Sequence, residues 1–188
     1  MSPPGFVGLL RLDTAFPRPV GDIGNRNTFD FPVRSRIVRG ATAARVVRGV
    51  ASALLQLAWL APLLPAGRRA GVITLDADAL GMHHLAAAGA APDTPVVGLP
   101  RDGALARAVF GDAPRLDRAR IREEVVDAGL RLKEAVPSLG AIVLECTNLP
   151  PYRDALMRAV CVPVHDCNTL LRWLWAGAAR PVPLEPAR

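Results

Sequence analysis

The chain has 188 residues and a mass of 20.0 kDa, which is the size of one domain or of one domain with part of a second. Hydrophobic residues make up 51% and charged residues 21%, and with a mean hydropathy of +0.23 these values exclude an intrinsically disordered chain. The net charge of +6 does not indicate a nucleic-acid partner, because the arginines are scattered and the aromatic side chains that would stack on bases make up only 5%.

The first 45 residues predict little regular structure. Residues 5–12 form a short apolar run that predicts a buried strand, and residues 31–38 predict a second strand. The rest of residues 15–45 is predicted as loop, because chain-breaking residues recur there at Pro17, Pro19, Gly21, Gly24, Pro32 and Gly40. A loop of this length is typical of a functional segment or of a domain that lacks a part.

Residues 50–64 form the most apolar run of the chain. Ser52, Gln56 and Pro62 interrupt the run, which is shorter than the ~18 residues of a membrane-spanning helix, so we expect a buried or docking helix. The first ten residues lack the basic start and the continuous apolar stretch of a secretion signal. The sequence thus predicts a cytoplasmic protein with no membrane partner.

From residue 70 onward, short apolar segments alternate with helical patterns. Strands are predicted at residues 70–75, 95–99, 141–144 and 162–165. Helices are predicted at residues 79–88, from Asp117 to just before Pro137 with an apolar stripe of Ile121, Val125, Ala128 and Leu132, and at residues 151–160 and 169–176. This alternation predicts an α/β fold with a parallel sheet flanked by helices, followed by a frayed tail at residues 181–188.

The cysteines and histidines do not form a metal-binding pattern. Cys146, Cys161 and Cys167 are too few for a disulfide framework and lack the paired C-x-x-C spacing of a structural zinc site, which favours a reducing compartment. The adjacent His83 and His84 point about 100° apart on a helix and so are predicted to be a solvent-facing pair.

Cys146 follows the predicted strand 141–144 and precedes the prolines that open the next helix. Ligands of parallel sheets bind beyond the carboxyl ends of the strands. The free N–H groups of a helix start would lower the pKa of a thiol and bind a carboxylate. One short segment therefore predicts both a base and an anion-binding loop, although Cys146 also fits a small apolar side chain at a strand end.

The segment Gly140–Pro150, with the sequence GAIVLECTNLP, resembles the second cysteine motif of the aspartate/glutamate/hydantoin racemase superfamily, in which Cys-Thr-x-x-Pro follows a core strand. Further resemblances to this family lie at residues 12–14, 21–25, 65–74, 162–166 and 170–174, so that most of the chain is covered.

The resemblance implies a cofactor-independent enzyme of two similar α/β lobes. Members of the family move a proton at the carbon next to a carboxylate or carbonyl with two facing cysteines. The resemblance assigns the acid/base role to Cys146 and binding of the substrate carboxylate to Thr147 and Asn148. It implies a small carboxylate substrate such as an amino acid, a hydantoin or a substituted malonate.

The first half of the sequence departs from this family. In the family, a strand, a cysteine loop and a helix lie between the two parts that residues 40–42 and 52–56 of this chain resemble. Here these two parts nearly abut, so a unit of about 30 or more residues is missing between them. No cysteine precedes Cys146. We therefore expect residues 1–50 to form an incomplete first lobe and residues 51–188 to form the second lobe with the Cys-Thr-Asn motif.

Three interpretations follow from the missing cysteine. The chain could be a one-thiol enzyme, like the decarboxylase branch of the family, which protonates an enolate from a single cysteine. It could be a truncated, non-catalytic member. It could also receive the missing group from another subunit of a homo-oligomer.

The remaining conspicuous residues have weaker claims to a function. Asp22 and Asn25 are predicted either to contact substrate or to complete turns, and His165 is predicted to orient substrate from a strand end. Cys161 is predicted in the core, and Cys167 either faces the cleft or caps the terminal helix. The tryptophans Trp59, Trp173 and Trp175 lie among leucines at helical spacing and are predicted core or interface residues.

Overall fold

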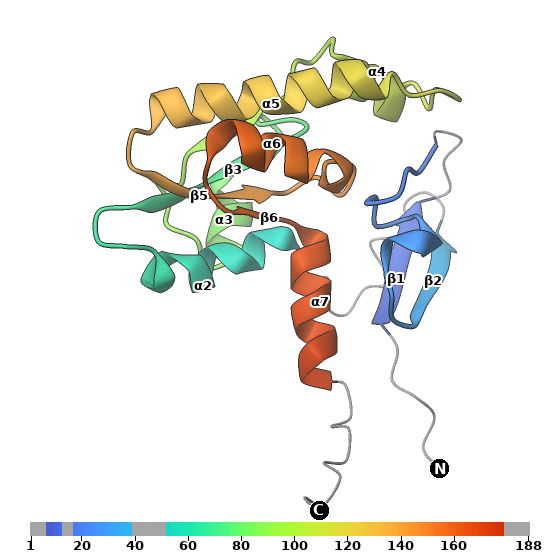
Figure 1. Cartoon of the computed structure of the whole chain (residues 1–188), viewed down its shortest axis with the longest axis horizontal. Coiled ribbons are helices and arrows are strands. Elements are labelled where there is room, and N and C mark those ends of the chain that lie inside the picture. Colours follow the sequence, from blue (N-terminus) through green and yellow to red (C-terminus); the bar gives the residue numbers. More distant parts are fainter. Residues whose placement is uncertain (1–6, 13–16, 39–51, 179–188) are drawn as a thin grey trace, which may run out of the picture.

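The computed structural model describes residues 7–12, 17–38 and 52–178 of the chain (Figure 1). Its main element is a four-stranded sheet with the order β4-β3-β5-β6, in which all neighbours are parallel. The strands are β3 (Arg69–Thr74), β4 (Val96–Gly98), β5 (Leu139–Leu144) and β6 (Val164–His165). A parallel sheet requires a crossover after each strand, and helices fill this role here.

Helical segments precede, connect and follow these strands. Before β3 lie η2 (Ala53–Leu55) and α2 (Gln56–Leu63). The crossovers contain α3 (Met82–Ala87), α4 (Ala104–Phe110), α5 (Arg118–Ala135), η3 (Pro150–Tyr152) and α6 (Arg153–Val160). After β6 the chain continues into α7 (Cys167–Ala178).

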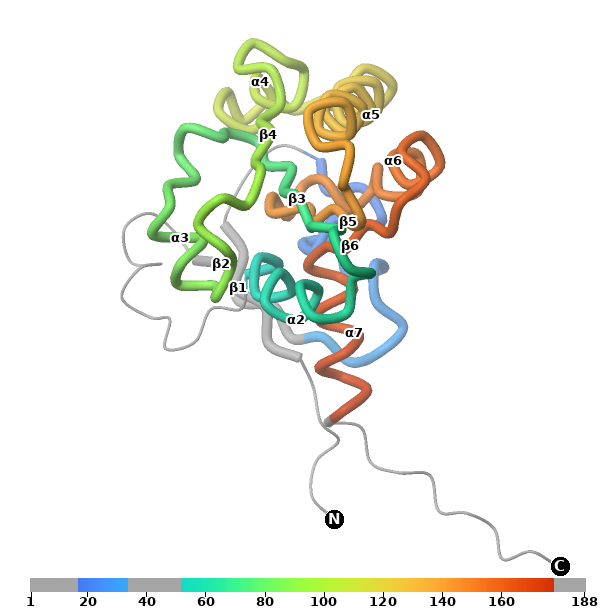
Figure 2. Tube along the Cα trace, turned by 90° about the vertical axis from the view of Figure 1, so that its left-hand side faces the viewer, coloured from blue at the N-terminus to red at the C-terminus, as the bar shows by residue number. Residues whose placement is uncertain are grey.

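The helices cover both faces of the sheet, as Figures 1 and 2 show from two directions. Successive side chains of β5 point to opposite faces: Ile142 and Leu144 pack with α5 and α6, whereas Ala141 and Val143 pack with η2, α2 and α3. Both faces are apolar because both are covered. This arrangement confirms the predicted α/β fold with a parallel sheet flanked by helices.

Helix α5 shows how the sequence pattern fixes the packing. Its predicted stripe, Ile121, Val125, Ala128 and Leu132, is completely buried. Asp117 caps the helix by accepting a hydrogen bond from the Arg120 N–H, at 3.0 Å. Gly129 lets α6 approach, since a Cβ atom there would lie 2.1 Å from Leu156 Cδ1.

A second, smaller sheet is built from residues that precede the main sheet in the sequence. Strands β1 (Val7–Leu12) and β2 (Val33–Val38) pair in parallel, with Val7 opposite Val33. The loop between them contains η1 (Arg26–Thr28). Its end is attached to α7, because Arg172 Nη1 lies 2.6 Å from Asp30 Oδ1 and the Phe31 ring stacks on Trp175 with centroids 5.2 Å apart.

Several element boundaries differ from the sequence prediction. Helix α3 begins at Met82 instead of residue 79, because the Asp76 carboxylate accepts hydrogen bonds from the Asp78 and Ala79 N–H groups and forms a turn. Helix α4 was not predicted. The buried Glu124 carboxylate of α5 accepts hydrogen bonds from the first N–H groups of α4, a contact between residues 20 positions apart that local patterns do not reveal.

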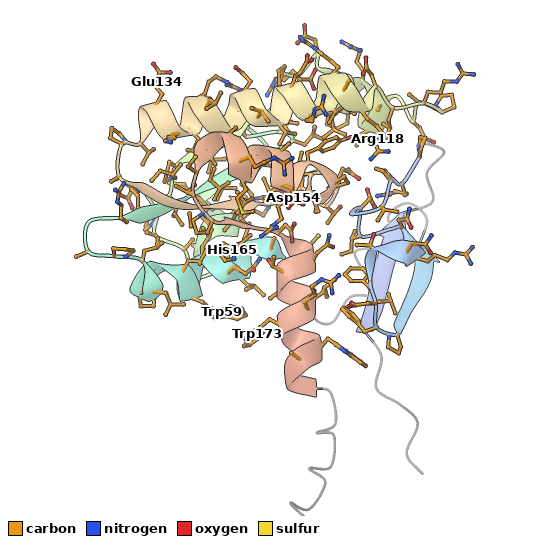
Figure 3. The ribbon with its side chains drawn as sticks, viewed as in Figure 1. Trp59, Arg118, Glu134, Asp154, His165 and Trp173 are labelled. Carbon is orange, nitrogen blue, oxygen red and sulfur yellow. The ribbon has the colours of Figure 1, made fainter. Side chains whose placement is uncertain are left out.

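Two predictions about single residues have clear outcomes. Cys161 is exposed, so its predicted place in the core is wrong; it ends α6 in a left-handed conformation with φ +56°. Trp59 and Trp173 lie against each other with ring centroids 4.5 Å apart (Figure 3), and both remain more than one-third exposed. They therefore form a surface pair instead of a core.

The described residues leave some expectations open. The division into lobes at residues 50 and 51 stays a prediction, because residues 39–51 lie outside the described part of the chain, as does the predicted tail 181–188. Within residues 7–12, 17–38 and 52–178, every helix is too short or too polar to cross a bilayer.

Candidate functional site

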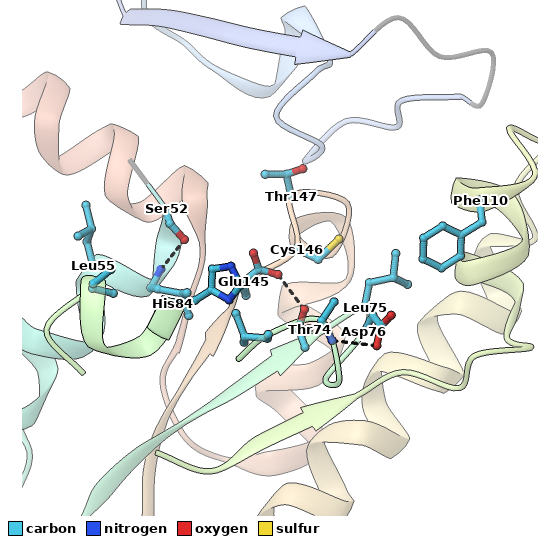
Figure 4. Close-up of a pocket in the computed structure, with 15 residues that line it drawn as sticks. Ser52, Leu55, Thr74, Leu75, Asp76, His84, Phe110, Glu145, Cys146 and Thr147 are labelled. Atoms are coloured by element: carbon cyan, nitrogen blue, oxygen red, sulfur yellow. Dashed lines mark hydrogen bonds between the residues drawn. The ribbon is translucent and has the colours of Figure 1, made fainter. Parts of the chain in front are cut away.

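A cavity of about 680 Å³ opens beyond the carboxyl ends of β3 and β5 (Figure 4). The end of each strand contributes to the wall: Thr74, the last residue of β3, with Leu75 and Asp76 after it, and Glu145, Cys146 and Thr147 after β5. Apolar residues of η2 and of the α3 region complete the wall, together with Ser52, His84 and Phe110. The cavity lies where open parallel sheets bind their ligands.

Cys146 is a half-buried residue that lines this cavity. The next residues turn back on it, since the Leu149 N–H donates to the Cys146 carbonyl at 3.1 Å. This turn brings two donors of Asn148 to the sulfur: its backbone N–H and its side-chain amide, whose Nδ2 lies 3.6 Å from Sγ. Cys146 thus borders the cavity while its sulfur accepts hydrogen bonds from Asn148.

Burial raises the pKa of the Cys146 thiol to about 11. The two Asn148 donors oppose this rise, whereas the negative charges of Glu145 and Asp22 add to it. The expectation that the helix start lowers this pKa is therefore wrong. The residues that begin the helix are Pro150 and Pro151, which have no N–H groups to offer, so the Asn148 donors alone do not offset the burial.

Asn148 is turned away from the cavity wall and toward the loop between β1 and β2. Its Oδ1 accepts a hydrogen bond from Arg18 Nη1 at 3.0 Å. Among the residues predicted to bind the substrate carboxylate, Thr147 lines the cavity, whereas Asn148 is engaged with Arg18 and Cys146. Their contact with substrate stays a prediction.

Asp22 and Asn25 complete turns in the loop that carries Arg18. The buried Asp22 carboxylate accepts from the Gly24 N–H at 2.6 Å and pairs with Arg18 at 3.3 Å. Asn25 Oδ1 accepts from the Asn27 N–H at 2.9 Å, and its Nδ2 donates to the Arg18 carbonyl at 2.6 Å. Both fit the turn-forming alternative, and neither belongs to the cavity wall.

His165 is the last residue of β6, and Cys167 is the first residue of α7. His165, labelled in Figure 3, is half-buried and is not among the residues that line the cavity. Burial lowers the pKa of its imidazole, and the nearby Arg153 charge lowers it further. Cys167 is buried in the core between the sheet and α2, so the predicted cleft-facing alternative is wrong. Burial also raises the pKa of the Cys167 thiol.

The sequence reasoning missed the part of the wall that follows β3. Thr74 Oγ1 donates to Glu145 Oε2 at 2.8 Å and so joins the ends of the two strands. Asp76 lies 3.7 Å from Arg101, and His84 Nδ1 accepts from the Gly81 N–H at 3.1 Å. Thr74 and Asp76 could have been found from topology, since β3 and β5 are neighbours and end at the same edge.

No three histidine, cysteine or acidic side chains of the described ranges converge in a way that could hold a metal ion. The acidic groups of the cavity wall are Asp76 and Glu145, and His84 adds an imidazole. The wall is otherwise mostly apolar, with Leu54, Leu55, Leu75, Leu80 and Phe110 among its members. Such a cavity fits a small molecule with an apolar part better than a metal or a polyanion.

Comparisons with known proteins support the fold and leave the function open. No family model matches the chain. Dimethylsulfoniopropionate lyase 5 of Emiliania huxleyi (strain CCMP1516) is 36% identical over 63 residues, which cover 34% of this chain and only 12% of that protein. The crystal structure of arylmalonate decarboxylase superposes with a TM-score of 0.55 over 94% of this chain and 96% of that chain, at 19% identity. The chain therefore shares the fold of this decarboxylase.

Proposed function

We propose that the protein belongs to the aspartate/glutamate/hydantoin racemase superfamily and catalyses cofactor-independent proton transfer at the carbon next to a carboxylate, with Cys146 as the proton carrier. The observation that carries this proposal is the Cys146 thiol in the wall of the cavity beyond β3 and β5. The fold shared with arylmalonate decarboxylase and the local similarity to a dimethylsulfoniopropionate lyase support it.

The state of the thiol favours a role as an acid. With a pKa of about 11, Cys146 is protonated at neutral pH and has a proton to give. A two-base racemase also needs a second proton carrier on the opposite face of the carbon. Cys146 is the first cysteine of the sequence and the one thiol in the described wall of the cavity.

These properties favour the one-thiol decarboxylase among the open interpretations. The bond from the α-carbon to one carboxylate breaks, CO₂ leaves, and the electron pair stays in an enolate of the remaining carboxylate. The α-carbon then takes the proton of Cys146, and the resulting thiolate regains a proton from water. The Asn148 N–H and Nδ2 donors, which point at Sγ, stabilise that thiolate.

The charged side chains of the cavity wall determine which candidate substrates must be tested. Asp76 and Glu145 repel the two carboxylates of a malonate, and an ammonium group beside those carboxylates, as in aminomalonate, offsets part of this repulsion. The panel therefore contains arylmalonates and aminomalonate as well as aspartate, glutamate and hydantoins.

The test is incubation with this panel in heavy water, with CO₂ release and deuterium at the α-carbon as the two readouts. We expect CO₂ release with one deuterium in the product, and loss of both signals in Cys146→Ala. Cys161→Ala removes an exposed thiol outside the cavity wall and serves as the matched control. Deuterium without CO₂ would indicate racemisation instead. No reaction with any compound, or equal rates in Cys146→Ala, would overturn the proposal and favour a non-catalytic member.

A further inference from the structure

We infer that Arg18 is a positioning residue for Cys146, which acts by fixing the orientation of the Asn148 side-chain amide. Arg18 Nη1 lies 3.0 Å from Asn148 Oδ1, and Asn148 Nδ2 lies 3.6 Å from Cys146 Sγ. The inference rests on the proposed role of Cys146 as proton carrier, but the chain of contacts can be tested without a substrate.

The chemistry of the guanidinium determines which end of the amide faces the sulfur. An amide presents an acceptor oxygen on one side and a donor NH₂ on the other, and a rotation of 180° exchanges them. Arginine has donors only, so the amide oxygen must face Arg18 and the NH₂ group must face Sγ. In the opposite orientation the oxygen would accept the thiol proton and stabilise the neutral thiol.

The loop between β1 and β2 holds Arg18 in place. The buried Asp22 carboxylate accepts from Arg18 Nη1 at 3.3 and 3.4 Å, and the Gly24 N–H orients that carboxylate at 2.6 Å. Asn25 Nδ2 binds the Arg18 carbonyl at 2.6 Å. Asp22 and Asn25 thus contribute to the site through Arg18, although neither lines the cavity.

The same loop is fastened to the segment that follows Cys146. Gly21 has φ +100° and packs against Pro151 so closely that a Cβ atom would lie 2.9 Å from Pro151 Cα. Asn168 Nδ2 donates to the Gly21 carbonyl at 2.7 Å. These contacts hold the loop close to the segment that carries Asn148. The packed loop therefore keeps Arg18 within reach of the Asn148 amide and determines its orientation.

A direct effect of charge on the sulfur must be separated from an effect through the amide. The Asp22 carboxylate, which pairs with Arg18, raises the pKa of the Cys146 thiol, so charges of this loop do act on the sulfur. An influence of Arg18 that passes through the Asn148 amide vanishes when that amide is removed, whereas a direct effect of charge persists.

The test is a double-mutant cycle on the alkylation rate of Cys146 by iodoacetamide at pH 8, with each cysteine resolved by peptide mass spectrometry. The rate reports the thiolate fraction. We expect Asn148→Ala and Arg18→Gln each to slow the reaction by up to about tenfold, because a hydrogen bond to the thiolate is lost. In the Asn148→Ala background, Arg18→Gln should change the rate by less than about twofold.

Three further variants serve as controls for this interpretation. Arg18→Lys keeps one donor for Oδ1 and should retain part of the wild-type rate. Asn148→Asp keeps the pair with Arg18 but replaces the NH₂ donor by an oxygen, so it should slow alkylation at least as much as Asn148→Ala. Arg172→Gln removes the ion pair with Asp30, which is another contact of the same loop. This variant should leave the alkylation rate of Cys146 unchanged if the chain stays folded.

Equal effects of Arg18→Gln with and without the Asn148 amide would overturn the inference, because they would indicate an effect that bypasses Asn148. An unchanged rate in Arg18→Gln would overturn it as well. Since no substrate is present, these outcomes are read independently of whether the protein turns over any compound of the panel.

Discussion

Two neighbouring segments of the same sheet edge, Glu145–Asn148 after β5 and Asp166–Thr169 after β6, both contain a cysteine and both lead into a helix. They differ in what their polar groups contact. In residues 166–169 the polar groups bind one another and the buried Gln56: Asp166 Oδ1 accepts from the Thr169 N–H at 2.8 Å, and Gln56 Nε2 donates to the Asp166 carbonyl at 2.8 Å. In Glu145–Asn148 three residues face the cavity.

The comparison shows that a cysteine at the end of a parallel strand is not by itself a candidate site. At Cys167 the helix begins at once and the thiol is enclosed in the core. At Cys146 the following prolines delay the regular helix, so the chain stays open to the cavity while Asn148 supports the sulfur. Access to a cavity, and not the position in the topology, distinguishes the two thiols.

Replacing each cysteine by alanine gives the largest expected difference. Cys146→Ala should lower kcat for the reaction found in the panel by about 10³-fold, because the proton donor is removed. Cys167→Ala should leave kcat within about twofold and lower the free energy of unfolding by about 1 kcal/mol, because a small buried group is lost. Steady-state kinetics and thermal unfolding of both variants check this. Equal losses of kcat would remove the distinction between the segments.

Alkylation of the wild-type protein should separate the thiols next. With a pKa of about 11 against 9.0 for an unperturbed cysteine, Cys146 should react about 100-fold more slowly at pH 8 than a free cysteine peptide. Cys167 should react more slowly still, because it is buried in the core. Iodoacetamide labelling followed by peptide mass spectrometry measures both rates. Faster labelling of Cys167 than of Cys146 would contradict the burial of the two sites.

Neutralising Glu145 should affect one thiol and spare the other. Glu145→Gln removes a negative charge that raises the pKa of Cys146 and keeps the side-chain size, so Cys146 should be alkylated about threefold to tenfold faster at pH 8. The pKa of Cys167 is raised by burial and by Asp166 instead, and its labelling rate should not change. An equal acceleration of both thiols would indicate general loosening of the fold.

The smallest expected effect concerns the pH dependence of stability. Burial raises the pKa of Asp166 above its usual 3.8, so the folded state binds this proton more tightly than the unfolded state. This carboxyl therefore favours folding at low pH, and its contribution is lost as pH rises through the folded pKa. Asp166→Asn should lack that loss. Denaturation at pH 4 and pH 7 should show wild type losing stability relative to Asp166→Asn between these values, and the reverse order would refute the expected direction.

Much of the fold could be predicted because its signals are local. The apolar stripe of α5 and the continuous apolar strand β5 are visible in the sequence and lie where they were expected. Helix α4 was missed because its stabilising Glu124 comes from another helix. The short sequence of α4 does not by itself show a pattern that predicts a helix.

The candidate site was predictable only at its centre. Cys146 and Thr147 could be chosen from their place after a strand, and both line the cavity. The roles of Arg18 and Asn148 depend on a contact between residues 130 positions apart, and the thiol pKa depends on burial. Neither long-range contacts nor burial can be derived from the residue types around the motif.

The pH dependence of the catalysed reaction tests the central claim most directly, because it shows whether Cys146 gives or takes the proton. A thiol with a pKa of about 11 is almost fully protonated between pH 6 and pH 9, so a proton-donating Cys146 predicts a nearly constant rate over this range, lost in Cys146→Ala. A rate that rises tenfold with each pH unit would show that the thiolate is the active form and would contradict the account.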